Sequence, residues 1–316
     1  MDQQEETIEH INRKRRIQAT PSIPLDVISE ILSKLPTKSV GRFRCVSKLW
    51  SSVTTDPYFI NRFETQSRQK KPSLLVTFKR GDRLFVFSIP QDRQTPNQPH
   101  SISSQPVHSY HIRYPKHCSF LPKESVHGLI SFANLSKPMI WNPTIRKFLT
   151  LNKPEKSWMN TMVFLGYDPI NNKHKVLCMP FNETIDECRV LTLGSAQGSW
   201  RKIKTNHKYL IRGYDTNYKC INGVLYYKAY ADQPDNADTI IMSFDVRSEK
   251  FHMIKFPWNN IRYCGELRLY KGMLACTRSN YPGQGITLWI LQDAEKHVWS
   301  PKTFFSLSLT MIRVSK

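Results

Sequence analysis

The stretch Ser22-Ile-Pro-Leu-Asp-Val-Ile-Ser-Glu-Ile-Leu-Ser-Lys-Leu-Pro-Thr-Lys-Ser-Val-Gly-Arg-Phe-Arg-Cys-Val-Ser-Lys-Leu-Trp50 decides the fold of the first part of the chain. Pro24 suits the first turn of a helix, where its missing N–H is not needed. Apolar residues then recur at helical spacing from Leu25 to Leu35. Pro36 ends the pattern, because proline disfavours helical geometry in the residue before it. The stretch therefore opens with a predicted amphipathic helix.

Two further short helices are predicted downstream. Thr37 is a ready N-cap for the first of them. The second has apolar residues from Val46 to Val53 at the spacing of one helical face, and Asp56-Pro57 closes it. Residues 22–63 thus form a predicted three-helix module, close to the smallest size that is stable alone. Its apolar surface either packs on the rest of the chain as a cap or docks on a partner helix.

The same stretch, continued by Asp56-Pro57-Tyr58-Phe59, resembles an F-box of the plant type. The matching elements follow in order: Pro24-Leu25, Ile31-Leu32, Leu35-Pro36, Lys38, Arg42-Phe43-Arg44 and Val46-Ser47-Lys48-Leu49-Trp50. Ile23 and Ser47 are mild departures from the family pattern. The resemblance implies docking on a Skp-family adaptor, and through it on a cullin, by Pro24, Leu25, Ile28, Ile31, Leu32, Leu35, Pro36, Val40, Phe43, Val46 and Trp50. The pattern does not separate residues that face an adaptor from those that hold the helices together.

Residues 64–72 are polar and basic and are predicted to be a linker, and residues 73–316 are predicted to be all-β. A strand, a turn and a second strand that opens with an aromatic recur in this domain. The anchors Trp141, Leu193, Phe244 and Leu291 are 52, 51 and 47 residues apart, and an earlier copy begins at Leu84. The second strands carry Phe148, Trp200, Phe251 and Trp299.

A glycine inside a strand-like run precedes three of these copies, at Gly128, Gly223 and Gly272. A period near 50 residues with several strands per repeat is typical of the kelch-like blades of a β-propeller. The fold class is therefore mainly β with a small all-α amino-terminal module, the β part being propeller-like with about five or six blades. A β-sandwich with coincidental spacing is the alternative.

Several stretches of this domain also resemble the F-box-associated domain of a large plant family: Ile140–Thr144, Gly166–Val176, Asn222–Tyr227 and Ile240–Lys255. The resemblance implies that residues 73–316 bind the protein to be ubiquitinated, without saying which protein that is. Binding residues concentrate on loops held by a rigid scaffold. The segments Ala231–Asp238 and Ser279–Gly285 are therefore candidates for the target face; the alternative, favoured for either loop taken singly, is that it only connects strands, and no target-binding residue is assigned.

The chain carries a net charge of +21 over its 316 residues. The excess is spread along the sequence, which favours a solvated basic surface or an acidic protein partner over a nucleic-acid groove. Residues 1–21 form a predicted flexible tail whose cluster Arg13-Lys14-Arg15-Arg16 resembles a weak nuclear-import signal. With seven scattered cysteines, no secretory signal and no run of about 18 apolar residues, the expected location is nucleus or cytoplasm, without a membrane.

Catalytic and metal-binding signatures are absent from the sequence. It holds no P-loop, no GxGxxG, no HExxH and no GxSxG, and His117-Cys118 is adjacent rather than at metal-ligand spacing. No cofactor is expected. The resemblance to an F-box followed by an F-box-associated domain implies a non-enzymatic substrate-recognition subunit of an SCF-type (Skp–cullin–F-box) ubiquitin ligase. The alternatives are a non-ligase β-propeller interaction protein and a basic nucleic-acid-binding protein, neither of which explains residues 22–63.

Overall fold

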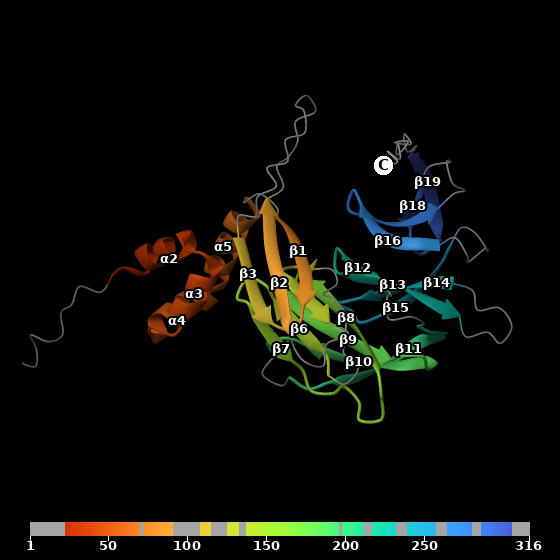
Figure 1. Ribbon diagram of the computed structural model, residues 1–316, viewed down its shortest axis with the longest axis horizontal. Helices are drawn as coiled ribbons and strands as arrows, with labels where there is room; N and C mark the ends of the chain where they lie inside the picture. Colours follow the sequence, from red (N-terminus) through yellow and green to blue (C-terminus); the bar gives the residue numbers. More distant parts are fainter. Residues whose placement is uncertain are drawn as a thin grey trace, which may run out of the picture. The chain divides into compact units, whose positions relative to one another are not determined.

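The computed structural model describes residues 23–69, 73–90, 108–114, 125–132, 137–195, 198–211, 217–231, 239–256, 264–279 and 286–304. Four short helices come first and strands follow to the end of the described chain (Figure 1). The predicted class, mainly β with a small helical module at the amino-terminal side, is confirmed. The basic cluster Arg13-Lys14-Arg15-Arg16 lies outside the described residues.

The helices are α2 (Leu25–Lys34), α3 (Thr37–Phe43), α4 (Lys48–Thr55) and α5 (Pro57–Gln69). Pro24 stands just before α2, and Leu35 after it is extended (ψ 153°), as the following Pro36 requires. The Ser47 hydroxyl caps α4 by accepting a hydrogen bond from the Trp50 N–H at 3.2 Å. The prediction of Thr37 as the N-cap of the second helix is wrong: Thr37 is the first residue of α3, Pro36 occupies the N-cap position, and no side chain caps this helix.

The fourth helix, α5, departs from the prediction of three helices and runs through most of the predicted linker 64–72. The Asp56 carboxylate accepts hydrogen bonds from the N–H groups of Tyr58 (2.8 Å) and Phe59 (3.2 Å). Pro57 occupies the first helical position, where it needs no N–H donor. The pair Asp56-Pro57 thus ends α4 and starts α5. The sequence-based prediction gave this pair only the first of these two roles.

The module has a small core of its own. Ile28, Leu32, Val40 and Phe59 are buried there. Around them pack the half-buried residues Leu35, Phe43, Trp50, Val53 and Phe63. The ring centroids of Phe43 and Trp50 lie 5.0 Å apart, which joins the end of α3 to α4. These four helices therefore bury a continuous apolar centre.

The strands fall into five groups along the chain. The first group is β1 (Ser73–Arg80), β2 (Arg83–Pro90) and β3 (His108–Arg113), and the second is β4 (Ser125–Val126), β5 (Leu129–Phe132), β6 (Met139–Asn142) and β7 (Lys147–Thr150). The third group is β8 (Thr161–Asp168), β9 (Lys173–Pro180), β10 (Ile185–Thr192) and β11 (Arg201–Leu210), and the fourth is β12 (Tyr218–Ile221), β13 (Val224–Ala231), β14 (Thr239–Asp245) and β15 (Phe251–Lys255). The fifth group is β16 (Cys264–Tyr270), β17 (Met273–Ser279), β18 (Ile286–Asp293) and β19 (Val298–Phe304). Within each of the last four groups, consecutive strands pair antiparallel. β11 and β13 join the third and fourth groups into one sheet through two residue pairs.

The predicted sequence repeat corresponds to the third strand, the turn and the fourth strand of a group. Trp141 pairs directly with Phe148, Phe244 with Phe251, and Leu291 with Trp299. In the β8–β11 group, Leu193 follows β10 and Trp200 precedes β11. The earlier copy at Leu84 lies in β2, the middle strand of the described β1–β3 sheet, and so does not have the third-strand position of the other copies. This recurrence confirms the predicted propeller-like domain of successive blades.

The recurrent glycines lie in turns rather than inside strands, which corrects that part of the prediction. Gly128, Gly223 and Gly272 have φ of +82°, +84° and +81°, and each links the first and second strands of its group. The residue before each also has positive φ, as in a type I′ turn. The β8–β9 connection has no such glycine and uses Asn172 (φ +51°), which explains the skipped copy.

Alanine substitutions at these three glycines separate two costs: the cost of left-handed backbone geometry and the cost of crowding by the added Cβ. At Gly128 and Gly272 a Cβ would meet no atom within 4 Å, so alanine costs only the left-handed backbone, about 1–2 kcal/mol. At Gly223 the Cβ would lie 3.1 Å from Pro169 Cδ. We expect Gly223→Ala to destabilise the protein by at least about 1 kcal/mol more than either control. Urea unfolding of the three variants measures this, and equal costs would contradict the packing of Gly223 on Pro169.

A second type of turn repeats along the chain. Asn142, Asp168, Asp245 and Asp293 each accept hydrogen bonds through Oδ1 from N–H groups two or three residues ahead. In each case the residue four places on has positive φ, at Arg146, Asn172, Glu249 and His297. The short side-chain oxygen nucleates the turn and the left-handed residue closes it. Three of the four residues are aspartates, so in these turns the carboxylates act as acceptors of backbone hydrogen bonds.

Buried hydroxyls connect neighbouring strand groups. Tyr218 on β12 bonds to the Ser131 hydroxyl on β5 at 2.8 Å and accepts the Leu165 N–H on β8 at 3.3 Å. Tyr209 on β11 and Tyr227 on β13 share a 2.8 Å hydroxyl–hydroxyl bond, both side chains being fully buried. Satisfied polar groups of this kind help to specify a single packing of the blades.

Candidate functional site

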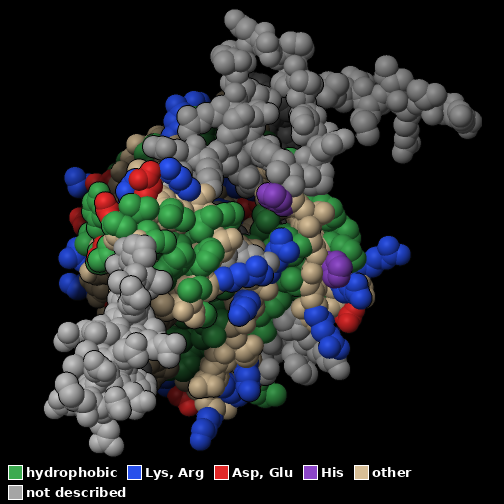
Figure 2. All heavy atoms as spheres, turned by 90° about the vertical axis from the view of Figure 1, so that its left-hand side faces the viewer, with side chains coloured by type: hydrophobic (Ala, Val, Ile, Leu, Met, Phe, Trp, Pro, Cys, Tyr) green, Lys and Arg blue, Asp and Glu red, His purple; other side chains and the backbone are tan. Residues whose placement is uncertain are grey.

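The helical module exposes apolar side chains outside its core. Leu25 and Ile31 on α2 are 54% and 44% exposed, and Val46 and Leu49 at the start of α4 are 62% and 43% exposed. Figure 2 views the molecule from the side that is on the left in Figure 1 and shows hydrophobic side chains exposed among basic ones. We refer to Leu25, Ile31, Val46 and Leu49 as the helical surface patch.

The structure divides the eleven predicted adaptor-binding residues into three sets. Pro24, Leu25, Ile31, Pro36 and Val46 are exposed. Leu35, Phe43 and Trp50 are half-buried, and Ile28, Leu32 and Val40 lie in the module's own core. Only the exposed set and the accessible edges of the half-buried set are available for direct contact. The buried set supports that surface from behind.

Four exposed apolar residues of the module were not among the predicted contacts: Ile23, Val27, Leu49 and Tyr58. Val27 lies four residues before Ile31, so helical spacing alone places the two on one face. Leu49 was noted within the α4 stripe, but a stripe at helical spacing does not say which of its edges is covered. The helical period was therefore the available signal for Val27 and Leu49.

The helical module also carries exposed basic residues close in sequence to Val46 and Leu49. Arg42, Arg44 and Lys48 are exposed and form no ion pair with a described residue. Lys34 pairs with Glu30 at 2.9 Å on α2, and its hydrogen bond and charge hold the pKa of Glu30 below the ordinary value. A small module that exposes several apolar and basic side chains is suited to binding another protein surface, because exposed apolar groups are unfavourable in water.

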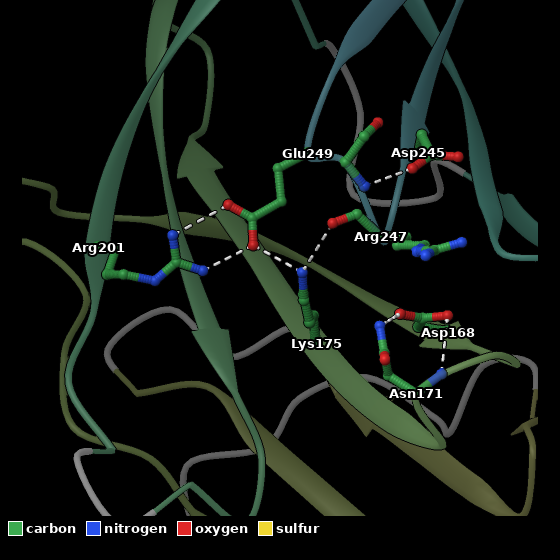
Figure 3. A network of polar contacts seen from close by, with 8 residues as sticks. Asp168, Asn171, Lys175, Arg201, Asp245, Arg247 and Glu249 are labelled. Atoms are coloured by element: carbon green, nitrogen blue, oxygen red, sulfur yellow. Dashed lines mark hydrogen bonds and ion pairs between the residues drawn. The ribbon is translucent and has the colours of Figure 1, made fainter.

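A polar network in the β domain connects the β8–β11 and β12–β15 groups (Figure 3). The Glu249 carboxylate accepts from Lys175 Nζ at 2.7 Å and from two nitrogens of Arg201 at 2.6 and 3.0 Å. Lys175 also donates to the Arg247 carbonyl at 3.4 Å. Burial alone would raise the pKa of Glu249, but Arg201 and Lys175 outweigh it and lower that pKa.

Asp168 has a comparable environment at the β8–β9 turn. Burial alone would raise the pKa of its carboxyl. Hydrogen bonds from the Asn171 side chain and from the N–H groups of Ile170 and Asn171, with the charge of Arg247, lower it instead. Asp168 therefore remains ionised while serving as a structural acceptor (Figure 3).

Most of the remaining predicted features fall outside the described residues. Residues 232–238 and 280–285, which make up nearly all of the two predicted target loops, are outside the described residues, as is His117-Cys118. Among the residues that are described, no three His, Cys, Asp or Glu side chains are grouped to hold a metal ion. None of the described helices has the length and apolar character needed to cross a bilayer.

Comparison with known proteins gives the same division of the chain. Residues 21–62 match the family described as F-box domain, and residues 73–316 match the F-box associated beta propeller domain. Two Arabidopsis thaliana proteins named for their F-box are 53% and 49% identical over 97% and 98% of this chain, which spans 78% of each of them. A Clostridium thermocellum α-L-arabinofuranosidase structure matches with 12% identity and a TM-score of 0.36, covering 75% of this chain and 95% of the other. That similarity is too low to support an argument.

The helical module with its exposed apolar side chains and the repeated β domain that follows it in the sequence define a class of proteins that join a small helical module to a propeller-like domain. The family matches cover both parts and most of the chain. This chain belongs to the plant F-box proteins with a carboxy-terminal F-box-associated β-propeller domain.

Proposed function

We propose that this protein is the substrate-recognition subunit of an SCF-type ubiquitin ligase. The helical surface patch docks on a Skp-family adaptor, which links it to a cullin, and the β domain holds the protein to be ubiquitinated. The observation that carries this proposal is the group of apolar side chains that α2 and α4 leave exposed beside a formed core.

The proposed mechanism is positional and involves no bond-making by this chain. One protein holds adaptor and target together, which raises the concentration of the target near the ubiquitin-loaded enzyme of the assembly. The energetics are sufficient: burying an exposed Leu or Ile side chain contributes about 1.5–3 kcal/mol, so a few residues of the patch supply much of a micromolar affinity.

The test is co-purification of the full chain with a Skp-family adaptor. Leu25→Asp/Val46→Asp places two charges in the helical surface patch without touching the module core. We expect this variant to lose at least about tenfold in adaptor affinity, because two central contacts are replaced by desolvated charges.

The matched control is Leu149→Asp/Ile286→Asp, which changes two residues of similar exposure (51% and 53%) in the β domain. This control should bind the adaptor like the unmodified chain. Failure of the unmodified chain to bind, or equal loss in both double variants, would sink the proposal. Circular dichroism of all three proteins verifies that the helices remain folded.

A further inference from the structure

Three turns from the β8–β11 and β12–β15 groups pack against one another at one end of these blades. They are Asp168–Lys173, Asn222-Gly223 and Asp245–Lys250. The Val246 N–H donates to the Gly223 carbonyl at 2.9 Å, and a Cβ on Gly223 would lie 3.1 Å from Pro169. Lys175, two residues beyond the first turn, reaches the Arg247 carbonyl in the third. The turns therefore form one continuous surface.

The acidic and basic residues of these turns have different environments. Asp168 and Asp245 accept turn N–H groups, and Glu249 is occupied by Lys175 and Arg201. The bases Lys173, Arg247 and Lys250 are exposed, and none forms an ion pair with a described residue. Ile170 stands among them with 65% of its surface exposed. We refer to Lys173, Arg247, Lys250 and Ile170 as the basic turn surface.

The charges do not cancel at this surface. With Lys175 and Arg201 included, five bases stand against the three carboxylates Asp168, Asp245 and Glu249, and all of these bases except Lys175 are more exposed than the carboxylates. The field outside the turns is therefore positive, and it acts from fixed positions because the network in Figure 3 anchors the backbone that carries Arg247.

We propose that the basic turn surface binds an acidic segment of a protein, and that this segment belongs to the target. The assignment of the segment to the target rests on the proposed function. Carboxylates pair with Lys173, Arg247 and Lys250, and an apolar side chain of the segment contacts Ile170. Hydrogen bonds hold the backbone of the turns that carry these side chains, so binding has to order the side chains but not the turns.

The surface suits a protein better than a nucleic acid. Single-stranded nucleic acid is bound by basic grooves in which bases stack on exposed aromatic rings. Among the described residues beside these turns, the aromatic Tyr167 is half-buried and stacked on His127 with ring centroids 3.8 Å apart. Its hydroxyl donates to Asn172 at 2.8 Å. The exposed apolar group at the centre of the surface is aliphatic Ile170.

The test measures binding of the full chain to a fluorescein-labelled peptide of alternating Glu and Leu residues by fluorescence anisotropy. The Lys173→Glu/Arg247→Glu/Lys250→Glu variant should lose about tenfold or more in affinity, since each of three contacts becomes repulsive. The control Lys204→Glu/Lys208→Glu/Lys255→Glu changes net charge equally at exposed sites elsewhere in the same domain. It should change affinity by less than about twofold.

Each other outcome has a definite meaning. Equal loss in both variants would show that only the overall charge attracts the peptide and would overturn the proposal. Tighter binding of a single-stranded DNA oligonucleotide, lost in the same turn variant, would assign the surface to nucleic acid instead. Equal binding of a Lys–Leu peptide would also overturn it. Adaptor co-purification of the same variants separates the two proposals. If the chain fails to bind the adaptor, the proposed function fails, but the result of the peptide-binding experiment still stands.

Discussion

Replacing Leu32 by alanine should unfold the helical module while leaving the β domain folded. Leu32 on α2 is fully buried between the other core residues of the module. A buried Leu→Ala change costs about 2–5 kcal/mol, a large share of the stability that so small a core provides. Hydrogen exchange followed by mass spectrometry should show the amides of α2 to α5 losing protection, with β8 to β15 unchanged.

The control for this prediction is Leu25→Ala on the same helix. Leu25 is 54% exposed, so its truncation should change stability by less than about 0.5 kcal/mol. Adaptor binding then distinguishes the two residues: Leu25→Ala weakens docking on a folded module, and Leu32→Ala removes it by unfolding. Retained amide protection in Leu32→Ala would contradict the assignment of this residue to the core.

The second large effect is expected at Glu249. Its carboxylate pairs with Lys175 and Arg201, and the Lys175 and Glu249 side chains are only 13% and 16% exposed. Glu249→Ala leaves a buried ammonium without its partner, which should destabilise the β domain by about 2–4 kcal/mol. Glu266→Ala is the matched control, because its ion pair with Arg268 is more than half exposed and contributes at most about 1 kcal/mol.

The pH dependence gives an independent measure of the same pair. Folding lowers the pKa of Glu249, so its contribution is present above the ordinary carboxyl value of about 4.3 and is lost as pH falls through the lowered folded pKa. Urea unfolding should therefore show a difference between the unmodified chain and Glu249→Ala that is full at neutral pH and shrinks in acid. A pH-independent difference would rule out the ion pair as its cause.

Much of the fold could be predicted from local patterns. The spacing of Trp141, Phe244 and Leu291 identified the third strand of successive blades, and their aromatic partners proved to be direct cross-strand neighbours. Local pattern was insufficient where one signal has two meanings. Asp56-Pro57 ends one helix and caps the next, and Gly223 reads equally well as strand or turn until its positive φ is known.

The functional surfaces were only partly predictable. Helical spacing identified apolar residues of α2 and α4, but it could not show that Leu32 faces inward while neighbouring Ile31 faces outward. The network around Glu249 joins residues 48 and 74 positions apart, which no local pattern reveals. Its existence depends on how two blades meet.

The turns that use Asp168 and Asp245 as backbone acceptors also have an evolutionary consequence. These aspartates are constrained by the hairpins they close, whereas the side chains of Lys173, Arg247 and Lys250 are exposed and form no ion pair with a described residue. Substitutions at those three positions can therefore accumulate in duplicated copies of the gene without disrupting the blades. If the basic turn surface binds as proposed, such proteins can change what they recognise while keeping one scaffold.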